Sequence, residues 1–379
     1  MNRRVMWVVV QLCALALAVP KAWAQRPPDT DPPTGVITQD IVMSWDRSAV
    51  PGEIVLLPEK TLLGFNTDQS KGYGRLHMTC RSESDSAEGR CPTVGSDITG
   101  ATVTEVPLSF AERRSGMRTD VRIVGALKRV FDDYRCYLDY WDESNRPIST
   151  TYSHVCFDRI AAGTGVSLSI PASELSKLVA GRWRAQLTMD VREAAGNLVL
   201  SSYVFNLDFT ITDYDAISIY FPEFDSIAPL VNMNLRFDPI RQVVAGRKEL
   251  QMCLYDGLGS QSEFLGVTVR DSGPRPPIGS DFAVWHSDGG SDDSQRLDYQ
   301  VGLNYGGNRL AMKHGVEQLL HGIDSAQLRL VLLPGMSQPV YCVPTPLTLE
   351  TPPTPIASKR PGRYDGELTV ELRVPTAKP

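Results

Sequence analysis

The chain has 379 residues, of which 42% are hydrophobic and 22% charged, a composition typical of globular proteins with sizeable cores. Its 38 basic and 44 acidic side chains give a formal net charge of -6, which argues against a general nucleic-acid binder, because phosphate contacts require a clustered positive surface. The five histidines lack metal-ligand spacing, and at roughly 100 to 200 residues per domain the length predicts two domains.

The N-terminus has the pattern of a secretory signal peptide. Arg3 and Arg4 precede an apolar run from Val5 to Val19, and Ala22-Trp23-Ala24 forms a small-x-small cleavage pattern. An uncleaved membrane anchor is the alternative, but the run is shorter than the roughly 20 residues that cross a bilayer. We therefore expect residues 1–24 to be a signal peptide that is removed on export.

The cysteine count fits an exported protein. Cys13 lies in the signal peptide, and an even number of six cysteines in an oxidising compartment predicts three disulfides. Several connectivities are possible, and the spacing favours neighbours along the chain. These pairs are Cys80 with Cys91, Cys136 with Cys156, and Cys253 with Cys342.

Alternation of apolar and polar residues predicts β-strands along most of the chain. The clearest runs begin at Trp183, Tyr203, Leu297 and Leu368, and each carries its apolar side chains on one face. Short strands separated by Gly, Pro, Asn and Asp turns indicate β-sandwiches. One short helix is expected at residues 171–178, because proline occupies its first turn and a glycine follows its end.

A domain boundary is predicted where the strand that ends at Ile211 meets a polar stretch. The expected organisation is a first domain at 25–212, a linker at 213–216 and a second domain at 217–379. Residues 25–35, rich in Pro and Asp, are expected to form a loose leader. The proline-dense segment Pro344 to Pro361 is expected to be an extended connector within the second domain.

Residue patterns that carry catalysis are scarce. The sequence has no Gly-x-Ser-x-Gly nucleophile elbow and no glycine motif that cradles phosphate. The acidic loop at 289–293 lacks the ligand spacing of a calcium hand. Acidic pairs such as Asp132-Asp133 carry little information in a chain with 44 acids. We therefore predict no enzyme, no metal site and no cofactor.

The densest basic cluster is Arg113 and Arg114, followed by Arg118 and Arg122. Guanidinium groups form charge-assisted, bidentate hydrogen bonds, so this cluster is a candidate binding site for an anionic sugar. The alternative is a solvated strand face.

Segments spread over most of the chain resemble a known family, the class 5 tip adhesins of chaperone-usher fimbriae, which includes CfaE-like and CblD-like proteins. The cysteine positions, the order of the segments and the domain split agree with that family. The segments are Tyr73–Cys80 with Cys91–Thr93, Leu108–Ser115, Ile170–Trp183, Ile219–Phe224, Met252–Gly257, and Cys342 with Gly362–Val370.

The resemblance implies an all-β protein with two immunoglobulin-like β-sandwich domains in tandem: an N-terminal adhesin domain, and a C-terminal pilin domain that lacks its last strand. A donor strand would then fill a groove beside Glu367 to Val374. The expected apolar residues of this groove are Leu368, Val370, Leu372 and Val374. Because unpaired strand edges aggregate, the groove requires an occupant.

The family also implies partners and a location. A periplasmic chaperone would supply the first donor strand, and the N-terminal extension of the major pilin subunit would replace it by β-augmentation at an outer-membrane usher. No alternating extension precedes the first domain, so this chain is expected to accept a strand and donate none. It would be exported through the periplasm and stand at the fimbrium tip on the cell surface.

Receptor binding in the family depends on arginines of the adhesin domain. By register with Cys80, one of them falls on Arg75, for which a structural salt bridge is the alternative role. The second basic site falls on Asp190 to Ala195, where only Arg192 is basic and the family has two adjacent arginines. The host receptor could be a glycan or a protein.

Two other functions stay open on the sequence. One is a secreted, self-contained β-sandwich, either a carbohydrate-binding module or an enzyme, whose second domain should be stable alone. The other is a pilus initiator that assembles normally and no longer adheres.

Overall fold

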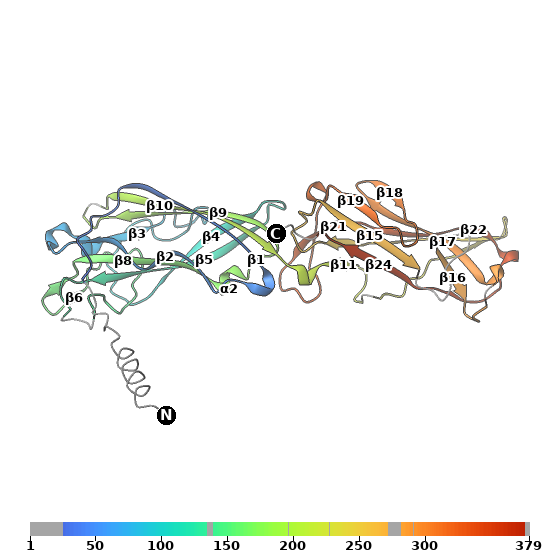
Figure 1. Cartoon of the computed structure of the whole chain (residues 1–379), viewed down its shortest axis with the longest axis horizontal. Helices are drawn as coiled ribbons and strands as arrows, with labels where there is room; N and C mark the ends of the chain where they lie inside the picture. Colours follow the sequence, from blue (N-terminus) through green and yellow to red (C-terminus); the bar gives the residue numbers. More distant parts are fainter. Residues whose placement is uncertain are drawn as a thin grey trace, which may run out of the picture.

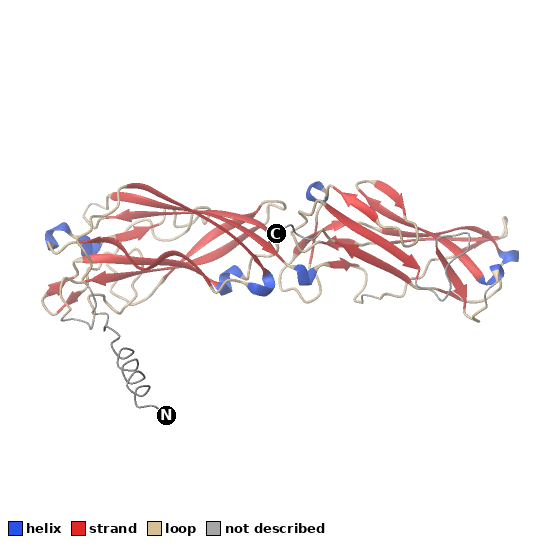
Figure 2. Ribbon diagram, in the orientation of Figure 1, coloured by secondary structure: helices blue, strands red, loops and turns tan. Residues whose placement is uncertain are grey.

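The computed structural model describes residues 26–134, 139–195, 197–226, 228–271, 282–290 and 292–375. The expected signal peptide lies outside these ranges. Two β-rich bodies lie end to end, and the chain passes from one to the other after β10 (Figure 1). Strands dominate both bodies, and helix is confined to short turns (Figure 2). None of the described helices is long and apolar enough to cross a membrane.

The first body consists mainly of long strands. These are β1 (Gly35–Asp46), β2 (Glu53–Phe65), β3 (His77–Thr79), β4 (Thr104–Glu112), β5 (Arg118–Val130), β8 (Gly163–Pro171), β9 (Gly181–Arg192) and β10 (Val199–Thr212). A small hairpin, β6 (Val155–Cys156) and β7 (Arg159–Ile160), and a single helical turn, α2 (Ala172–Leu175), complete it. The expected helix is shortened to α2, because the backbone bonds that follow join residues three apart instead of four.

The first body is a sandwich because its sheet folds over along β9. The strand order is β1-β10-β9-β4-β5-β8-β2, with β3 also beside β9. β9 pairs with β10 along its whole length but meets β4 at only two residue pairs, so the sheet bends there into two layers. The completely buried side chains of Phe110, Trp183, Phe205 and Phe209 lie in the core of the sandwich.

The N-terminal segment is more ordered than the sequence suggested. Thr30, in the expected loose leader, exchanges two backbone hydrogen bonds of 2.8 Å with Phe65. β1 then runs parallel to β10 over its full length, although the other strand pairs of this sheet are antiparallel. Its inward residues Ile37, Ile41 and Met43 pack on the core, so burial holds the segment in place.

The second body has mostly shorter strands, arranged in a seven-stranded sheet, in which β18 also pairs with β17, and two smaller sheets. Its strands are β11 (Ser218–Tyr220), β12 (Arg236–Asp238), β13 (Val243–Leu250), β14 (Cys253–Tyr255), β15 (Phe264–Asp271), β16 (Phe282–His286), β17 (Arg296–Tyr305), β18 (Asn308–Ala311), β19 (Gln318–His321), β20 (Arg329–Val331), β21 (Val340–Pro344), β22 (Leu347–Pro355), β23 (Tyr364–Asp365) and β24 (Leu368–Arg373). The sheet orders are β12-β13-β22-β17-β16-β23, β11-β14-β21-β20 and β19-β15-β24.

The prediction of an extended connector at Pro344 to Pro361 is wrong. Most of it forms β22, which lies between β13 and β17 inside a sheet, with Leu347 and Leu349 buried. The two adjacent prolines, Pro352 and Pro353, fall where the register between β22 and β13 shifts. A bulge tolerates residues that cannot donate a ladder hydrogen bond, so proline density did not prevent strand formation.

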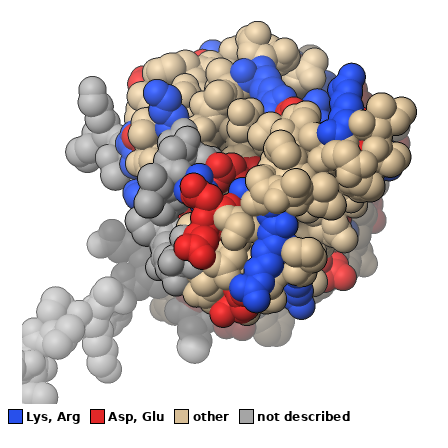
Figure 3. Space-filling view, turned by 90° about the vertical axis from the view of Figure 1, so that its right-hand side faces the viewer, with Lys and Arg blue, Asp and Glu red and all other residues tan. Residues whose placement is uncertain are grey.

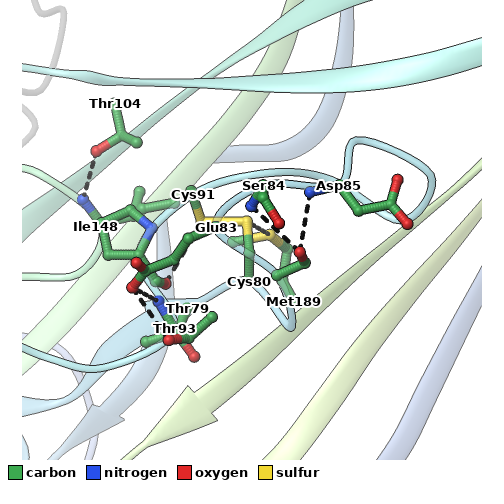
Figure 4. The surroundings of a disulfide bond; sticks show 12 residues. Thr79, Cys80, Glu83, Ser84, Asp85, Cys91, Thr93, Thr104, Ile148 and Met189 are labelled. Carbon is green, nitrogen blue, oxygen red and sulfur yellow. Dashed lines mark hydrogen bonds between the residues drawn. A yellow bond between two sulfur atoms is a disulfide. The ribbon is translucent and has the colours of Figure 1, made fainter.

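Two of the expected disulfides lie within the described residues. Cys80 pairs with Cys91 and Cys253 with Cys342, with Cα–Cα distances of 5.2 and 5.7 Å. Cys156 is also disulfide-bonded, and its expected partner Cys136 lies outside the described residues. The first bridge closes a loop after β3 that is pinned by hydrogen bonds, among them those from Thr93 to the Glu83 carboxylate at 3.1 and 3.2 Å (Figure 4).

The two bodies are joined by packing as well as by the chain. Tyr255 of the second body is buried in the same apolar cluster as the core of the first. Gln261 donates to Glu112 across the junction at 3.2 Å. A Cβ on Gly259 would lie 2.7 Å from the carbonyl oxygen of Ala180, which requires glycine there. The first body therefore has one buried end, at this junction, and one free end.

Candidate functional site

Arg75 lies at the free end of the first body. It closes a short turn, η3 (Tyr73–Arg75), that leads into β3. The turn is seated tightly, because a Cβ on Gly74 would lie 1.9 Å from the carbonyl oxygen of Ala161. The Arg75 side chain is exposed, and within the described ranges no hydrogen bond or ion pair engages its guanidinium. Its N–H donors therefore face solvent in a form that can bind an acceptor group.

Arg192 lies at the same end but is engaged by the protein itself. It ends β9, opposite His77 of β3. Its guanidinium donates to the Thr79 hydroxyl at 2.9 Å and to the Asn197 carbonyl oxygen at 2.8 Å, and it lies 3.6 Å from Asp190. With its side chain only 18% exposed, Arg192 offers less to a ligand than Arg75 does.

Arg113 and Arg114 lie at the other end of the first body, beside the junction. Arg114 donates to the carbonyl oxygens of Ile323 and Ala326 in the second body. Arg113 is exposed, and its backbone N–H bonds to Arg182 near the start of β9. Because β9 rises about 3.3 Å per residue, its two ends are on the order of 35 Å apart. The structure therefore does not bring the four candidate arginines into one site.

Sequence reasoning missed a buried polar network beneath the free end. Arg146 binds Asp142 at 2.7 Å and lies 2.9 Å from the Nδ1 of His154. Burial raises the pKa of Asp142, but hydrogen bonds from the Ser144 N–H and from Arg146 outweigh it and hold that pKa below its usual value. Arg129 is completely buried alongside, and burial lowers its pKa to about 9.

A signal for Arg129 was present in the sequence. Val121, Ile123 and Leu127 alternate along β5 and face the core. Arg129 continues the same parity, so the period of two places it inward rather than on the solvated face. A buried arginine needs hydrogen-bond acceptors inside the protein. The alternation alone could therefore have predicted a buried polar network around Arg129.

The last strand of the second body has an open side. β24 pairs with β15 and, among the described residues, with no other strand. Leu368, Val370, Leu372 and the following Val374 are only partly buried, although they pack on the core of the second body. We call these four residues the open seam.

A second segment packs on the same core without joining a sheet. In residues 228–235, Val231 and Met233 are partly buried, while the residues between and after them are exposed. Among the described residues, no backbone hydrogen bond connects this segment to a strand. Leu230, at 91% exposed, and Leu235 leave further apolar surface uncovered. The second body therefore leaves apolar residues and backbone groups uncovered on this side.

The far end of the second body shows no surface of a single charge. Basic and acidic side chains are interspersed there (Figure 3). The acidic loop singled out in the sequence begins beside Asp288, whose carboxylate binds Gln295 at 2.8 Å, His286 at 3.0 Å and Arg360. These bonds close the loop on itself. No group of three or more metal-binding side chains occurs within the described part of the chain.

Comparison with known families matches both bodies. Residues 20–214 match the first domain, and residues 217–376 the second domain, of CfaE, a subunit of the CFA/I fimbria. The chain is 29% identical over 316 residues to that fimbrial protein of Escherichia coli, covering 79% of this chain and 80% of the relative.

Two solved structures are similar over nearly the whole length. CfaE, the adhesive subunit of the CFA/I fimbria of enterotoxigenic Escherichia coli, is 25% identical, with a TM-score of 0.68 over 93% of this chain and 95% of that chain. A structure of a chaperone-tip adhesin complex of CFA/I fimbriae biogenesis matches at 25% identity and a TM-score of 0.66, over 93% and 99% of the two chains.

Proposed function

The chain belongs to the CfaE family of CFA/I fimbrial proteins, and we propose that it is the minor tip subunit that initiates a chaperone-usher fimbria and attaches it to a host surface. It is exported through the periplasm and stands at the fimbrium tip. The relatives are adhesins, and no catalytic role is proposed.

The open seam is the observation that carries the assembly role. A self-contained sandwich would cover Leu368, Val370 and Leu372 with a further strand of its own. Here the residues stay half-buried beside an unpaired strand edge, an arrangement that invites aggregation if it is left bare. We infer that a strand of another protein pairs with β24 by β-augmentation and covers the seam.

The proposed donors follow the order of assembly. A periplasmic chaperone fills the seam first, in keeping with the solved complex of a related tip adhesin with its chaperone. The N-terminal strand of the major pilin then replaces it at the outer-membrane usher. Because the exchange replaces one β-strand with another, the apolar contacts with the seam are conserved throughout.

Adhesion is proposed for the free end of the first domain, centred on Arg75. Its exposed guanidinium can make bidentate, charge-assisted hydrogen bonds to a receptor, whether that receptor is a glycan or a protein. Arg192 supports the neighbouring backbone. Arg113 and Arg114 are left out of this site, because they lie at the junction and Arg114 is bonded to the second domain.

The assembly role is tested by melting the full mature chain with and without a peptide of the major pilin's N-terminal strand. The peptide should raise the melting temperature of the second domain, and Val370→Asp should abolish the shift by placing a charge in the seam. The matched control, Thr369→Asp, changes the neighbouring exposed position. A second domain that melts cooperatively at one temperature, with or without peptide, would establish a self-contained module instead.

The adhesive role is tested on epithelial cells and a glycan array. Arg75→Ala should reduce binding at least tenfold, because it removes the bidentate donor. Arg184→Ala, an exposed arginine of β9 paired with Asp208, should bind as the native protein does. A folded native protein that binds neither cells nor glycans would support an initiator that does not adhere.

A further inference from the structure

Arg129 has an unusual environment for a charged residue. Its side chain is completely buried, and it donates to the carbonyl oxygens of Leu76, Thr150 and Tyr152 at 2.7 to 2.9 Å and to the hydroxyl of Thr164. None of these acceptors is a carboxylate. Burying a guanidinium without a direct counter-ion is energetically costly, and an apolar side chain would stabilise such a site better. The arrangement therefore calls for an explanation other than stability.

Two of the hydrogen bonds of Arg129 lead to the turn that carries Arg75, one directly and one through Thr164. Its Nη1 donates to the carbonyl oxygen of Leu76, the residue directly after Arg75, at 2.8 Å. The same Nη1 donates to the Thr164 hydroxyl, which in turn donates to the carbonyl oxygen of Tyr73 at 2.8 Å. The backbone is thus held on both sides of Arg75, while Gly74 between them rests on Ala161.

The charge of Arg129 also acts on the direction of the Arg75 side chain. The two guanidinium groups interact, since Arg75 is among the groups that lower the pKa of Arg129. Like charges repel, so the buried cation disfavours an Arg75 side chain folded back onto the protein. Two carboxylates of this end of the first body are engaged by other arginines: Asp142 binds Arg146, and Asp190 lies against Arg192.

From this geometry we propose that Arg129 and Thr164 are positioning residues, which clamp the Arg75 turn in one conformation and keep its guanidinium directed toward a receptor. The proposal rests on the adhesive function proposed for Arg75. It adds a rigid support to that site, and a pre-organised turn binds more tightly because less freedom is lost on association. It also explains why a costly buried cation lies directly beneath the exposed one.

The clamp is tested without any receptor by trypsin cleavage of the Arg75–Leu76 bond in the full mature chain, purified with its co-expressed chaperone. Thr164→Val keeps the shape of the side chain but removes the bond to Tyr73. It should speed cleavage after Arg75 about tenfold, because cleavage requires local opening of the turn. Thr164→Ser restores the hydroxyl and should return the native rate.

Cleavage after Arg241 provides an internal reference, because this residue lies in the second domain with its side chain 78% exposed. Its rate should be the same in every variant. Arg129→Lys retains a charge but cannot reach Leu76 and Thr164 with one planar group, so it should also speed cleavage after Arg75. Unchanged cleavage after Arg75 in both Thr164→Val and Arg129→Lys would overturn the clamp.

Adherence to epithelial cells tests the second half of the proposal. Thr164→Val should lower adherence several-fold in protein that is still folded, and Thr164→Ser should restore it. If cleavage after Arg75 rises while adherence stays native, rigidity of the turn plays no part in binding and the positioning role is refuted. Adherence of Arg75→Ala tests the proposed adhesive function, and cleavage after Arg75 in the Thr164 and Arg129 variants tests the clamp. Either proposal can therefore be refuted without the other.

Discussion

β10 and β24 close their respective domains and look alike in sequence, yet they differ in burial. Both alternate apolar and polar residues, but Phe205 and Phe209 of β10 are completely buried, while Val370 and Leu372 of β24 are only partly so. β10 has a neighbour on each side, β1 and β9, whereas β24 has only β15 among the described strands. Alternation thus predicts a strand, but the presence of its second neighbour decides how much it contributes to stability.

The largest expected effect contrasts the disulfides of the two domains. Chain-entropy estimates give about 4.6 kcal/mol for the loop between Cys253 and Cys342 and about 2.8 kcal/mol for the shorter loop between Cys80 and Cys91. Replacing both cysteines of a pair by alanine should therefore destabilise the second domain more than the first. Urea unfolding of the two double variants measures the difference. Equal losses would show that loop length does not set the contributions of these two disulfides.

A core substitution should distinguish the covered core of the first domain from the open seam of the second. Trp183→Ala removes a completely buried ring that donates to the Val179 carbonyl oxygen at 2.8 Å, and should cost the first domain about 3 to 5 kcal/mol. Val370→Ala should cost the donor-free second domain less than about 1 kcal/mol, because the side chain is half exposed. With the donor peptide bound, that loss should rise. If Val370→Ala lowers the free energy of unfolding equally with and without the peptide, the peptide does not bind at the seam.

Acidification should affect the first domain through two histidines, the buried His77 and the partly buried His154. Burial lowers the pKa of His77 and of His154, and the cations Arg129 and Arg146 add to the effect on His154. The unfolded chain, with histidine near pKa 6.5, then binds protons more readily than the folded one. Stability is therefore highest above about pH 6.5 and falls as the pH drops below that value.

Thermal melts at pH 7, 6 and 5 measure this dependence. His154→Gln should flatten it, because glutamine keeps a polar group beside Arg146 and does not titrate. The depressed pKa of Asp142 adds a further loss at more acidic pH, as that carboxylate becomes protonated. A first domain whose melting temperature is constant from pH 7 to 5 would contradict the assignment.

The smallest effects are expected from exposed ion pairs on the two sheets. Arg184 pairs with Asp208 between β9 and β10, and Arg373 of β24 binds Glu317 at 2.6 Å and stacks over Phe264. Exposed pairs contribute up to about 1 kcal/mol, so Arg184→Ala should be near neutral. Arg373→Ala should cost slightly more, because β24 lacks a second neighbour. Denaturant titrations measure both losses of unfolding free energy. Equal losses in Arg184→Ala and Arg373→Ala would show that the missing neighbour of β24 does not matter for such a pair.

The strands that begin near Trp183, Tyr203 and Leu368 could be predicted from the sequence. Apolar and polar residues alternate there, as they do in a strand with one buried face. The sequence was misleading at Pro352 and Pro353, where composition indicated a connector and tertiary pairing produced a strand with a bulge. Composition likewise gave no sign that β1 would run parallel to β10, a pairing of distant segments that local patterns do not encode.

The candidate site was only partly predictable. Register with Cys80 pointed to Arg75, but the engagement of Arg192 depends on Thr79 and Asn197, which reach it through tertiary structure. The proximity of Arg113 and Arg114 in sequence suggested one basic cluster. Only the fold reveals that Arg114 bonds to the second domain and that the length of β9 separates these two arginines from Arg75.

The parallel pairing of β1 with β10 has a mechanical consequence for a protein tethered at both ends. A load between the free end and the second domain enters the first domain through the end of β10, and Asp213, directly after that strand, is paired with Arg47 at 3.1 Å. The ladder bonds of β10 to β1 and β9 run across the direction of pull, so they are sheared together rather than opened one by one. With receptor binding at the free end, as proposed, the first domain would resist stretching along its long axis, the direction in which a flowing medium would pull an attached cell.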